Sequence, residues 1–419
     1  MKLLFQFLIG LGTISMMAQS SLSGKITDTK NQPLFGVEIY ATELHKGTTT
    51  DENGNYVFKN IPNGKIKINI SYVGYNTISK VFTFNSEEKT FNTQLKEAVF
   101  EIDEVIISTP FNKLQSENVM KVERLTAKSL QKTGATTLSE GISNIAGVSQ
   151  ISTGASIGKP VIRGLSGNRV LVYTQGIRLE NQQFGGEHGL GVNDAGVASI
   201  EVIKGPASLL YGSDALGGVL YINPEKFAPE NKTLFNVNQR YFSNTLGSNT
   251  SLGAKTSTEN WKFLARGTYA VHSDYKIPTN QRVTNTRFKE KDLKLGLGFN
   301  QTNFSSELRY NFNNSKLGLT EGIGPQSTAT TPLEPFQDIS NHVLSLHNHF
   351  FFGNSKLDAD FGYVVNDRQE FEEHEDEADH EEEESAALRM KLKTFSYNVK
   401  YHLPKGEKLE TLIGIQGMR

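Results

Sequence analysis

The sequence predicts a β-rich protein of several domains: a small β-sandwich, a mixed α/β domain, and the first strands of a transmembrane antiparallel β-barrel. Short β-rich runs separated by turn residues fill the first hundred residues or so. A glycine-rich stretch follows, in which helical and strand patterns alternate. From Thr233 onward, apolar and polar residues alternate with a period of two, as the strands of a transmembrane barrel require.

The composition and the missing motifs exclude several classes of protein. The 419 residues include no cysteine, so disulfides, thiolate nucleophiles and cysteine-bound zinc are excluded. A net charge of −2 argues against a general nucleic-acid binder. The sequence contains no His-Glu-x-x-His motif, nucleophile elbow or phosphate loop, so we do not expect an enzyme.

Residues 1–18 have the pattern of a secretory signal peptide. Lys2 gives a positive start, the stretch to Met17 is mostly apolar without acidic residues, and Ala18 offers a small residue for cleavage. The run is too short to span a bilayer as a helix. No later stretch is apolar enough for a transmembrane helix, so we expect any membrane insertion to occur as a β-barrel.

Residues 19–98 are predicted to form the small β-sandwich. Turn residues such as Asn53-Gly54 separate the β-rich runs. The expected strands cover residues 22–26, 37–41, 56–58, 65–72 and 77–82. The motifs at 24–28, 33–37 and 50–56 resemble the carboxypeptidase-regulatory-like domain, which in its family is a non-catalytic appendage.

Segment 99–110 connects the sandwich to the next domain and has a β-branched apolar centre. It has two interpretations, of which one is a further sandwich strand. The other is an exposed strand that adds to another protein's sheet edge through main-chain hydrogen bonds, and its place between two domains favours this one. The residues of this coupling segment are Glu104, Val105, Ile106, Ile107 and Ser108.

Residues 111–228 are predicted to form the mixed α/β domain. Helical patterns cover 127–130 and 137–145, and strand patterns cover 169–173 and 200–203. Glycine pairs and Gly-Pro steps between them mark tight turns.

The run from 200 to 219, with the stretch 161–173 before it, closely resembles the signature of the plug domain of TonB-dependent receptors. The residues that carry the signature are Arg163, Gly164, Gly205, Pro206, Tyr211, Gly212, Gly217 and Gly218. One departure is Gln175, since the family usually has an aspartate there before the glycine. This departure puts in doubt any polar contact that the aspartate would make.

The resemblance implies a transport receptor of the Gram-negative outer membrane, surrounded by outer-membrane lipid. The plug and the N-terminal domain would face the periplasm. TonB, with its inner-membrane energising complex, would pair with residues 104–108 and pull on the plug. A surface lipoprotein over the barrel is a further candidate partner, because the appendage domain often occurs in glycan importers.

Residues 229–419 are predicted to form part of the barrel. Leu293, Leu295 and Leu297, for example, alternate with polar residues. Tight turns at 301–302, 353–355 and 404–407 separate long polar loops near 275–290, 313–340 and 366–386. Because such barrels keep short turns in the periplasm and long loops outside, these loops are expected to be external.

About nine strands fit into this region, whereas transporters with a filled lumen need about twenty-two. We therefore expect the sequence to be a truncated copy of a longer protein that does not close a pore by itself.

The external loop near residues 366–386 is the candidate ligand site. Eleven of the fifteen residues from 370 to 384 are acidic, and five of the nine histidines lie between His342 and His380. His347 and His349 share one face of their strand, expected to be the lumen side. Imidazole nitrogen together with carboxylates favours zinc or copper over calcium or magnesium. The candidate metal ligands are Glu373, His374, Asp376, Glu377, Asp379 and His380, with Glu187 and His188 in the plug.

The predicted function is TonB-dependent import of a metal ion or metal complex, with no resident cofactor. The external loop would catch the ligand and pass it to the plug near Glu187 and His188. An acidic run can also be a merely solvated loop. An iron–siderophore or another organic ligand is the alternative cargo, and a surface adhesin or a signal transducer is the alternative role.

Overall fold

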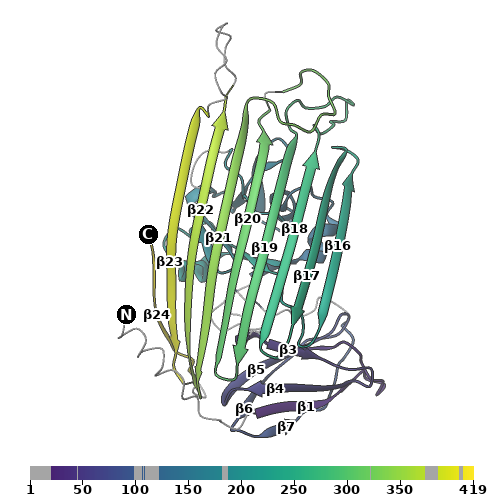
Figure 1. Ribbon diagram of the computed structural model, residues 1–419, viewed down its shortest axis with the longest axis vertical. Coiled ribbons are helices and arrows are strands. Elements are labelled where there is room, and N and C mark those ends of the chain that lie inside the picture. The colour runs from purple at the N-terminus through teal and green to yellow at the C-terminus, as the bar shows by residue number, and fades with distance from the viewer. Residues whose placement is uncertain are drawn as a thin grey trace.

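The computed structural model describes residues 20–44, 46–98, 106, 108, 122–181, 187–320, 322–372, 386–404 and 409–419. A nine-stranded antiparallel wall runs along the long axis of the molecule. A mixed domain lies against one face of this wall, and an N-terminal domain lies at one end of it (Figure 1). The predicted fold class is confirmed. The expected signal peptide lies outside the described residues, and no helix within them is long and apolar enough to cross a membrane.

The N-terminal domain consists of two small sheets around a shared core. One sheet has the order β4-β1-β7 with β8 beside β1, and the other has the order β3-β2-β5-β6. Alternate residues point inward, so Leu22, Phe58 and Ile68 lie in the same apolar cluster. The elements are β1 (Ser20–Thr27), β2 (Glu38–Ala41), η1 (Thr42–Leu44), β3 (Lys46–Thr49), β4 (Asn55–Ile61), β5 (Gly64–Ser71), β6 (Ile78–Phe84), β7 (Glu88–Thr90) and β8 (Thr93–Gln94). All five predicted strands coincide with or overlap these.

The mixed domain, called the plug below, contains a five-stranded sheet of order β13-β12-β15-β14-β9 and a separate β10-β11 hairpin. In the five-stranded sheet, only the β12–β15 pair is parallel. The described elements are β9 (Val122–Thr126), α2 (Ala127–Lys132), α3 (Leu138–Ile142), β10 (Val148–Thr153), β11 (Ile157–Ile162), η3 (Gly167–Arg169), β12 (Val170–Thr174), β13 (Ile177–Leu179), β14 (Val197–Ile203), η4 (Gly205–Tyr211) and β15 (Gly218–Pro224).

Helix α3 is shorter than the helix predicted at 137–145. Thr137 caps its start by accepting a hydrogen bond from the Glu140 amide. At its end, Ser143 and Asn144 donate from their side chains to main-chain carbonyls (2.6 and 3.1 Å). Such local bonds compete with continuation of the helix, which explains the early stop.

Within the described residues, the wall is built from nine strands, each antiparallel to the next along the chain. They are β16 (Thr233–Phe242), β17 (Gly247–Ser257), β18 (Trp261–His272), β19 (Phe288–Gln301), β20 (Phe304–Gly318), β21 (Phe336–Phe352), β22 (Ser355–Phe371), β23 (Leu388–His402) and β24 (Leu412–Met418). Phe263, Leu295 and Tyr363 are exposed on the outer face, whereas Arg266 and Lys294 are buried on the inner face. The predicted alternation is therefore confirmed.

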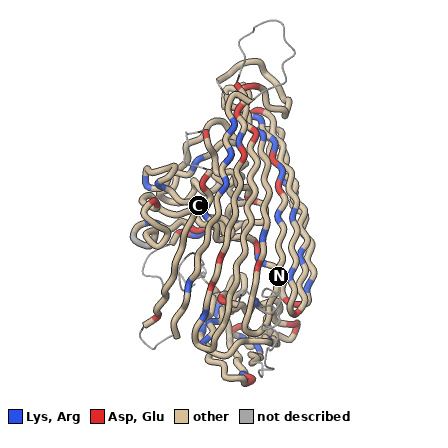
Figure 2. The backbone as a smooth tube through the Cα atoms, turned by 60° about the vertical axis from the view of Figure 1, so that its left-hand side comes forward, with Lys and Arg blue, Asp and Glu red and all other residues tan. Residues whose placement is uncertain are grey.

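The strands are longer than the sequence predicts. Gly318 pairs with Phe336, and Phe336 pairs with Phe371, so the loop expected at 313–340 covers only residues 319–335. Because the inner face of these strand ends is polar, their sequence has the composition of a loop. Figure 2 shows basic and acidic residues close together along the upper parts of the wall strands.

The N-terminal domain is attached to the end of the wall where the strands are joined by short turns. Phe351 of β21 is buried in the core cluster of the N-terminal domain. Asn60 donates to the Glu259 carboxylate (2.5 Å), and Lys226 pairs with Glu38 (3.0 Å). Apolar burial and polar contacts together hold the domain across this end.

Candidate functional site

The coupling segment is described at two positions, Ile106 and Ser108, and both are buried against the plug. Ile106 is 1% exposed and belongs to a cluster with Leu171 and Val219. The Ser108 amide donates to the Glu201 carboxylate (2.8 Å), and the Tyr211 hydroxyl donates to the Ser108 carbonyl. The expectation of an exposed strand is therefore wrong at these two residues. Glu104, Val105 and Ile107 lie outside the described residues.

Glu201 is the residue of this contact that the sequence analysis does not identify. It is a fully buried carboxylate in the apolar strand β14, and Asn223 donates to its second oxygen (2.9 Å). Arg124 lies 3.8 Å away from it. A lone acidic residue inside an apolar strand is the available signal, because a buried charge needs partners.

The glycines of the plug signature form the turns around this contact. Gly205 and Gly212 have positive φ angles (+78° and +110°), and they bracket η4, which carries Tyr211. Gly218 has φ +145°, and a Cβ there would lie 2.6 Å from the Ile203 carbonyl oxygen. The signature thus sets the close strand packing that places Tyr211 over Ser108.

The other signature residues are part of the same local structure. Arg163 and Gly164, both with positive φ, form the exposed turn after β11. Gly217 allows close approach, since a Cβ there would lie 2.9 Å from that of Leu165. Pro206 is at the start of η4, where its fixed φ suits a helix.

His188 lies at the face of the plug near the long loops and contacts the wall. Its Nε2 lies 3.3 Å from the Glu370 carboxylate, near the end of β22. Burial, helped by Arg368 and Lys159 nearby, lowers the pKa of His188 to about 4. The imidazole is therefore neutral at ordinary pH, the form in which histidine binds transition metals. Glu187 beside it is exposed.

The acidic loop that the sequence predicts to bind metal lies outside the described residues. This applies to Glu373, His374, Asp376, Glu377, Asp379 and His380. Their neighbours Glu370 and Glu372 are described, so the loop begins next to His188. Among the residues that the structure describes, no group of three or more histidines and acids has the geometry of a metal site.

Three histidines line the inner face of the wall near its short-turn end. His347 contacts Asp360 (2.8 Å), and Asp358 lies between His349 (2.6 Å) and His402 (2.8 Å). The lumen side predicted for His347 and His349 is confirmed. All five side chains line a cavity of about 1020 Å³ that also touches the plug and the N-terminal domain.

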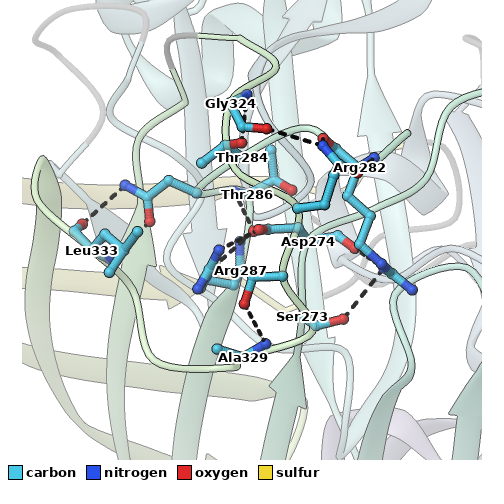
Figure 3. A network of polar contacts seen from close by, with 12 residues as sticks. Ser273, Asp274, Arg282, Thr284, Thr286, Arg287, Gly324, Ala329 and Leu333 are labelled. Atoms are coloured by element: carbon cyan, nitrogen blue, oxygen red, sulfur yellow. Dashed lines mark hydrogen bonds and ion pairs between the residues drawn. The ribbon is translucent and has the colours of Figure 1, made fainter.

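The long loops that the structure describes, 273–287 and 319–335, are joined to each other by polar contacts. Asp274, fully buried, accepts hydrogen bonds from the main-chain amides of Thr286 and Arg287 and pairs with the Arg287 side chain (Figure 3). The Asn285 side chain donates to three carbonyls of the next loop, at 2.8 to 3.0 Å. These contacts fix two neighbouring loops relative to each other.

Comparison with known proteins gives two domain matches. The chain matches the CarboxypepD_reg-like domain at 22–107 and the TonB-dependent Receptor Plug Domain at 115–219. It is 28% identical over 219 residues to the TonB-dependent receptor SusC of Bacteroides thetaiotaomicron (50% of this chain, 21% of that protein). It is 30% identical over 131 residues to the vitamin B12 transporter BtuB of Vibrio vulnificus (30% and 21%).

A solved structure shares the fold. The ferric enterobactin receptor PfeA of Pseudomonas aeruginosa superposes with a TM-score of 0.54 and 17% identity, over 71% of this chain and 48% of that one. The chain spans about a fifth of the length of the curated relatives it matches.

A plug domain held against a wall of long antiparallel strands is the fold that this chain shares with the solved receptor structure. The chain therefore carries a carboxypeptidase-regulatory-like domain followed by a plug domain like that of the TonB-dependent receptor family. Members of this family are transporters and not enzymes, and they lie in the Gram-negative outer membrane with the plug toward the periplasm.

Proposed function

We propose that this protein imports a metal ion or metal complex, with zinc or copper as the metal, across the outer membrane with energy supplied through TonB. The family assignment and the transporter name of BtuB support the transport role. The observation that carries the choice of ligand is the contact between His188 and Glu370. It joins the plug to the wall where the acidic run of residues 370–384 begins.

The chemistry of this contact suits a metal better than a sugar or a peptide. A neutral imidazole and a carboxylate 3.3 Å apart provide the nitrogen and oxygen donors that zinc and copper accept. The loop histidines His374 and His380 and the acids Glu373, Asp376, Glu377 and Asp379 would supply further donors. Glu187, exposed beside His188, would take part in the transfer.

Release of the coupling segment is the proposed output. Ser108 is held by Glu201 and Tyr211, and both belong to elements of the plug. Ligand contact at the outer face of the plug would loosen this hold and make residues 104–108 available. TonB would then pair with them as an added strand and pull, so that the plug rearranges and the ligand passes.

The test is a competitive titration of the full-length receptor with zinc, copper, nickel, iron and calcium. One variant has the acidic residues of 373–384 changed to amides, and a second is His188→Asn. His342→Asn, on the same wall but away from the plug, is the matched control. Zinc or copper binding that weakens in the first two variants supports the proposal, whereas unchanged binding, or binding no tighter than that of calcium, contradicts it.

Transport itself is tested separately by deleting residues 104–108. Uptake should be lost while surface binding of the ligand remains. Uptake that survives the deletion would contradict the TonB mechanism and leave the metal titration unaffected.

An iron–siderophore is the second candidate cargo. The buried bases Arg368 and Lys159 near His188 favour it, because chelates of this kind are often anionic. A surface adhesin would not need a coupling segment. A signal transducer should carry an N-terminal signalling domain, whereas the domain before the plug matches the carboxypeptidase-regulatory-like domain.

A further inference from the structure

The turn between β12 and β13 is fastened to the wall at β21. The Gln175 side-chain amide donates to the Val343 carbonyl (3.1 Å), and His347 Nε2 donates to the Gln175 carbonyl (2.9 Å). An aspartate at 175 could not make the first bond, because an ionised carboxylate is only an acceptor. The first of these two bonds therefore depends on the residue that departs from the family pattern, whereas the second uses its main-chain carbonyl.

His347 makes a second bond from the other side of its ring. Its Nδ1 lies 2.8 Å from the Asp360 carboxylate on β22. A main-chain carbonyl and a carboxylate are both acceptors, so both ring nitrogens must carry protons to make both bonds. The geometry therefore requires the charged imidazolium at His347.

The surfaces at this joint fit closely. Gly176 has φ +77°, and a Cβ there would lie 2.8 Å from His347 Cε1. On the wall, a Cβ at Gly362 would lie 2.6 Å from the Ile177 side chain. Gly176 thus makes room for the His347 ring, and Gly362 makes room for the hairpin. A larger residue at either position would prevent this close contact.

Several charged and titratable groups face His347 from the elements around it. Asp360 on β22 and Glu307 on β20 are the anions. Lys400 on β23 and His349 on β21 interact electrostatically with Asp360. Tyr221 on β15 lies near Gly176. Asp360 holds the ring directly, through the hydrogen bond to Nδ1.

We propose that His347 is a proton-dependent latch between the plug and the barrel wall. In the charged form, the ring ties the Gln175 carbonyl to Asp360 and holds the hairpin in place. Loss of the proton removes one of the two bonds, so the hairpin leaves the wall more easily. The latch is closed at low pH and weakens as the pH rises through the range in which the ring titrates. It concerns release of the plug and does not depend on the cargo.

The test is hydrogen exchange of residues 170–179 in the full-length receptor from pH 5.5 to 9, corrected for intrinsic exchange rates. Wild-type protection should fall about tenfold as the pH rises, the size expected for loss of a hydrogen bond to a charged group. His347→Gln should abolish this dependence. His342→Gln, which changes a histidine of the same strand outside the joint, should retain it.

Asp360→Asn separates a titrating latch from simple packing. A neutral partner stabilises the imidazolium less, so the transition should move to lower pH, whereas a packing role predicts no movement. The nitrogen NMR spectrum of histidine-labelled wild-type receptor provides a check that needs no variant to fold. A neutral His347 ring at pH 6, or a wild-type profile that His347→Gln leaves unchanged, would overturn the proposal.

Discussion

Glu201 and Tyr211 hold the coupling segment through main-chain groups of Ser108. Because neither bond uses the serine side chain, the position accepts a reporter residue. The chain contains no cysteine, so Ser108→Cys gives a single thiol within these 419 residues. The rate at which this thiol reacts measures how often the segment opens.

Tyr211→Phe, made in the Ser108→Cys background, should raise the reaction rate of this thiol about fivefold, because a hydrogen bond contributes about 1 kcal/mol. Glu201→Gln should raise the rate further, since the main-chain amide at position 108 loses a charged acceptor. Thiol labelling of the full-length receptor in detergent measures both. Equal rates in all variants would mean that these residues do not hold the segment.

Gly218→Ala should destabilise the plug by about 2 kcal/mol or more. The residue has φ +145°, and the new Cβ would lie 2.6 Å from a main-chain oxygen that cannot move aside. Gly267→Ala is the control, because no atom of the described residues would lie within 4 Å of its Cβ. Denaturant unfolding followed by a probe in the plug compares the two, and equal midpoints would contradict the packing argument.

His188 should make the plug less stable in acid. Burial lowers its pKa from 6.5 to about 4, so the unfolded chain binds the proton more readily than the folded plug. Stability is therefore lost as the pH falls from about 6.5 to about 4. In His188→Asn, the unfolding midpoint should change less with pH over this range than it does in the wild type. A slope equal to that of wild type would assign the effect to other groups.

At the scale of elements, the loop between β18 and β19 contains a buried ion pair, Asp274 with Arg287. Asp274 is fully buried and Arg287 is 2% exposed, so removing the base leaves a buried carboxylate with its main-chain hydrogen bonds but without a cation beside it. Arg287→Met should destabilise the loop by about 3 kcal/mol.

Hydrogen exchange of residues 273–287 should then rise in Arg287→Met, while the β17–β18 pair keeps its protection. A uniform rise over the whole wall would instead indicate loss of the barrel. No change in exchange anywhere would show that the Asp274–Arg287 ion pair does not stabilise this loop.

At the scale of the whole molecule, the N-terminal domain closes the short-turn end of the wall. Asn60 and Glu259 are in contact across this junction. In the full-length receptor, the double variant Asn60→Cys with Glu259→Cys should be joined by a short bifunctional thiol reagent, because the ends of the two native side chains are in contact. Each single-cysteine variant, which lacks the second thiol, is the control and should not be cross-linked.

Gel mobility without reductant measures the cross-link. Absence of the cross-link between positions 60 and 259, with both thiols reactive, would mean that the domain does not rest on the wall in solution.

Local patterns in the sequence determined the β-rich fold class, the strands of the sandwich and the alternation of the wall. The period-two exposure of Phe263, Leu295 and Tyr363 is visible in the chain because each strand has one apolar face. The plug signature was equally readable, since four of its five glycines have positive φ angles that few other residues adopt (Gly164, Gly205, Gly212 and Gly218).

Contacts between distant residues were decided only by the tertiary structure. Ser108 meets Glu201 and His347 meets Gln175 across separations of 93 and 172 residues, and His188 meets Glu370 in the same way. No local period encodes such pairs, because they depend on how the plug sits against the wall. The burial of Ile106 and the extent of β20 to β22 differ from the sequence-based expectation for the same reason. The apolar segment around Ile106 is buried only when it packs against the plug. The polar face of a wall strand is likewise enclosed only when the plug and the wall come together.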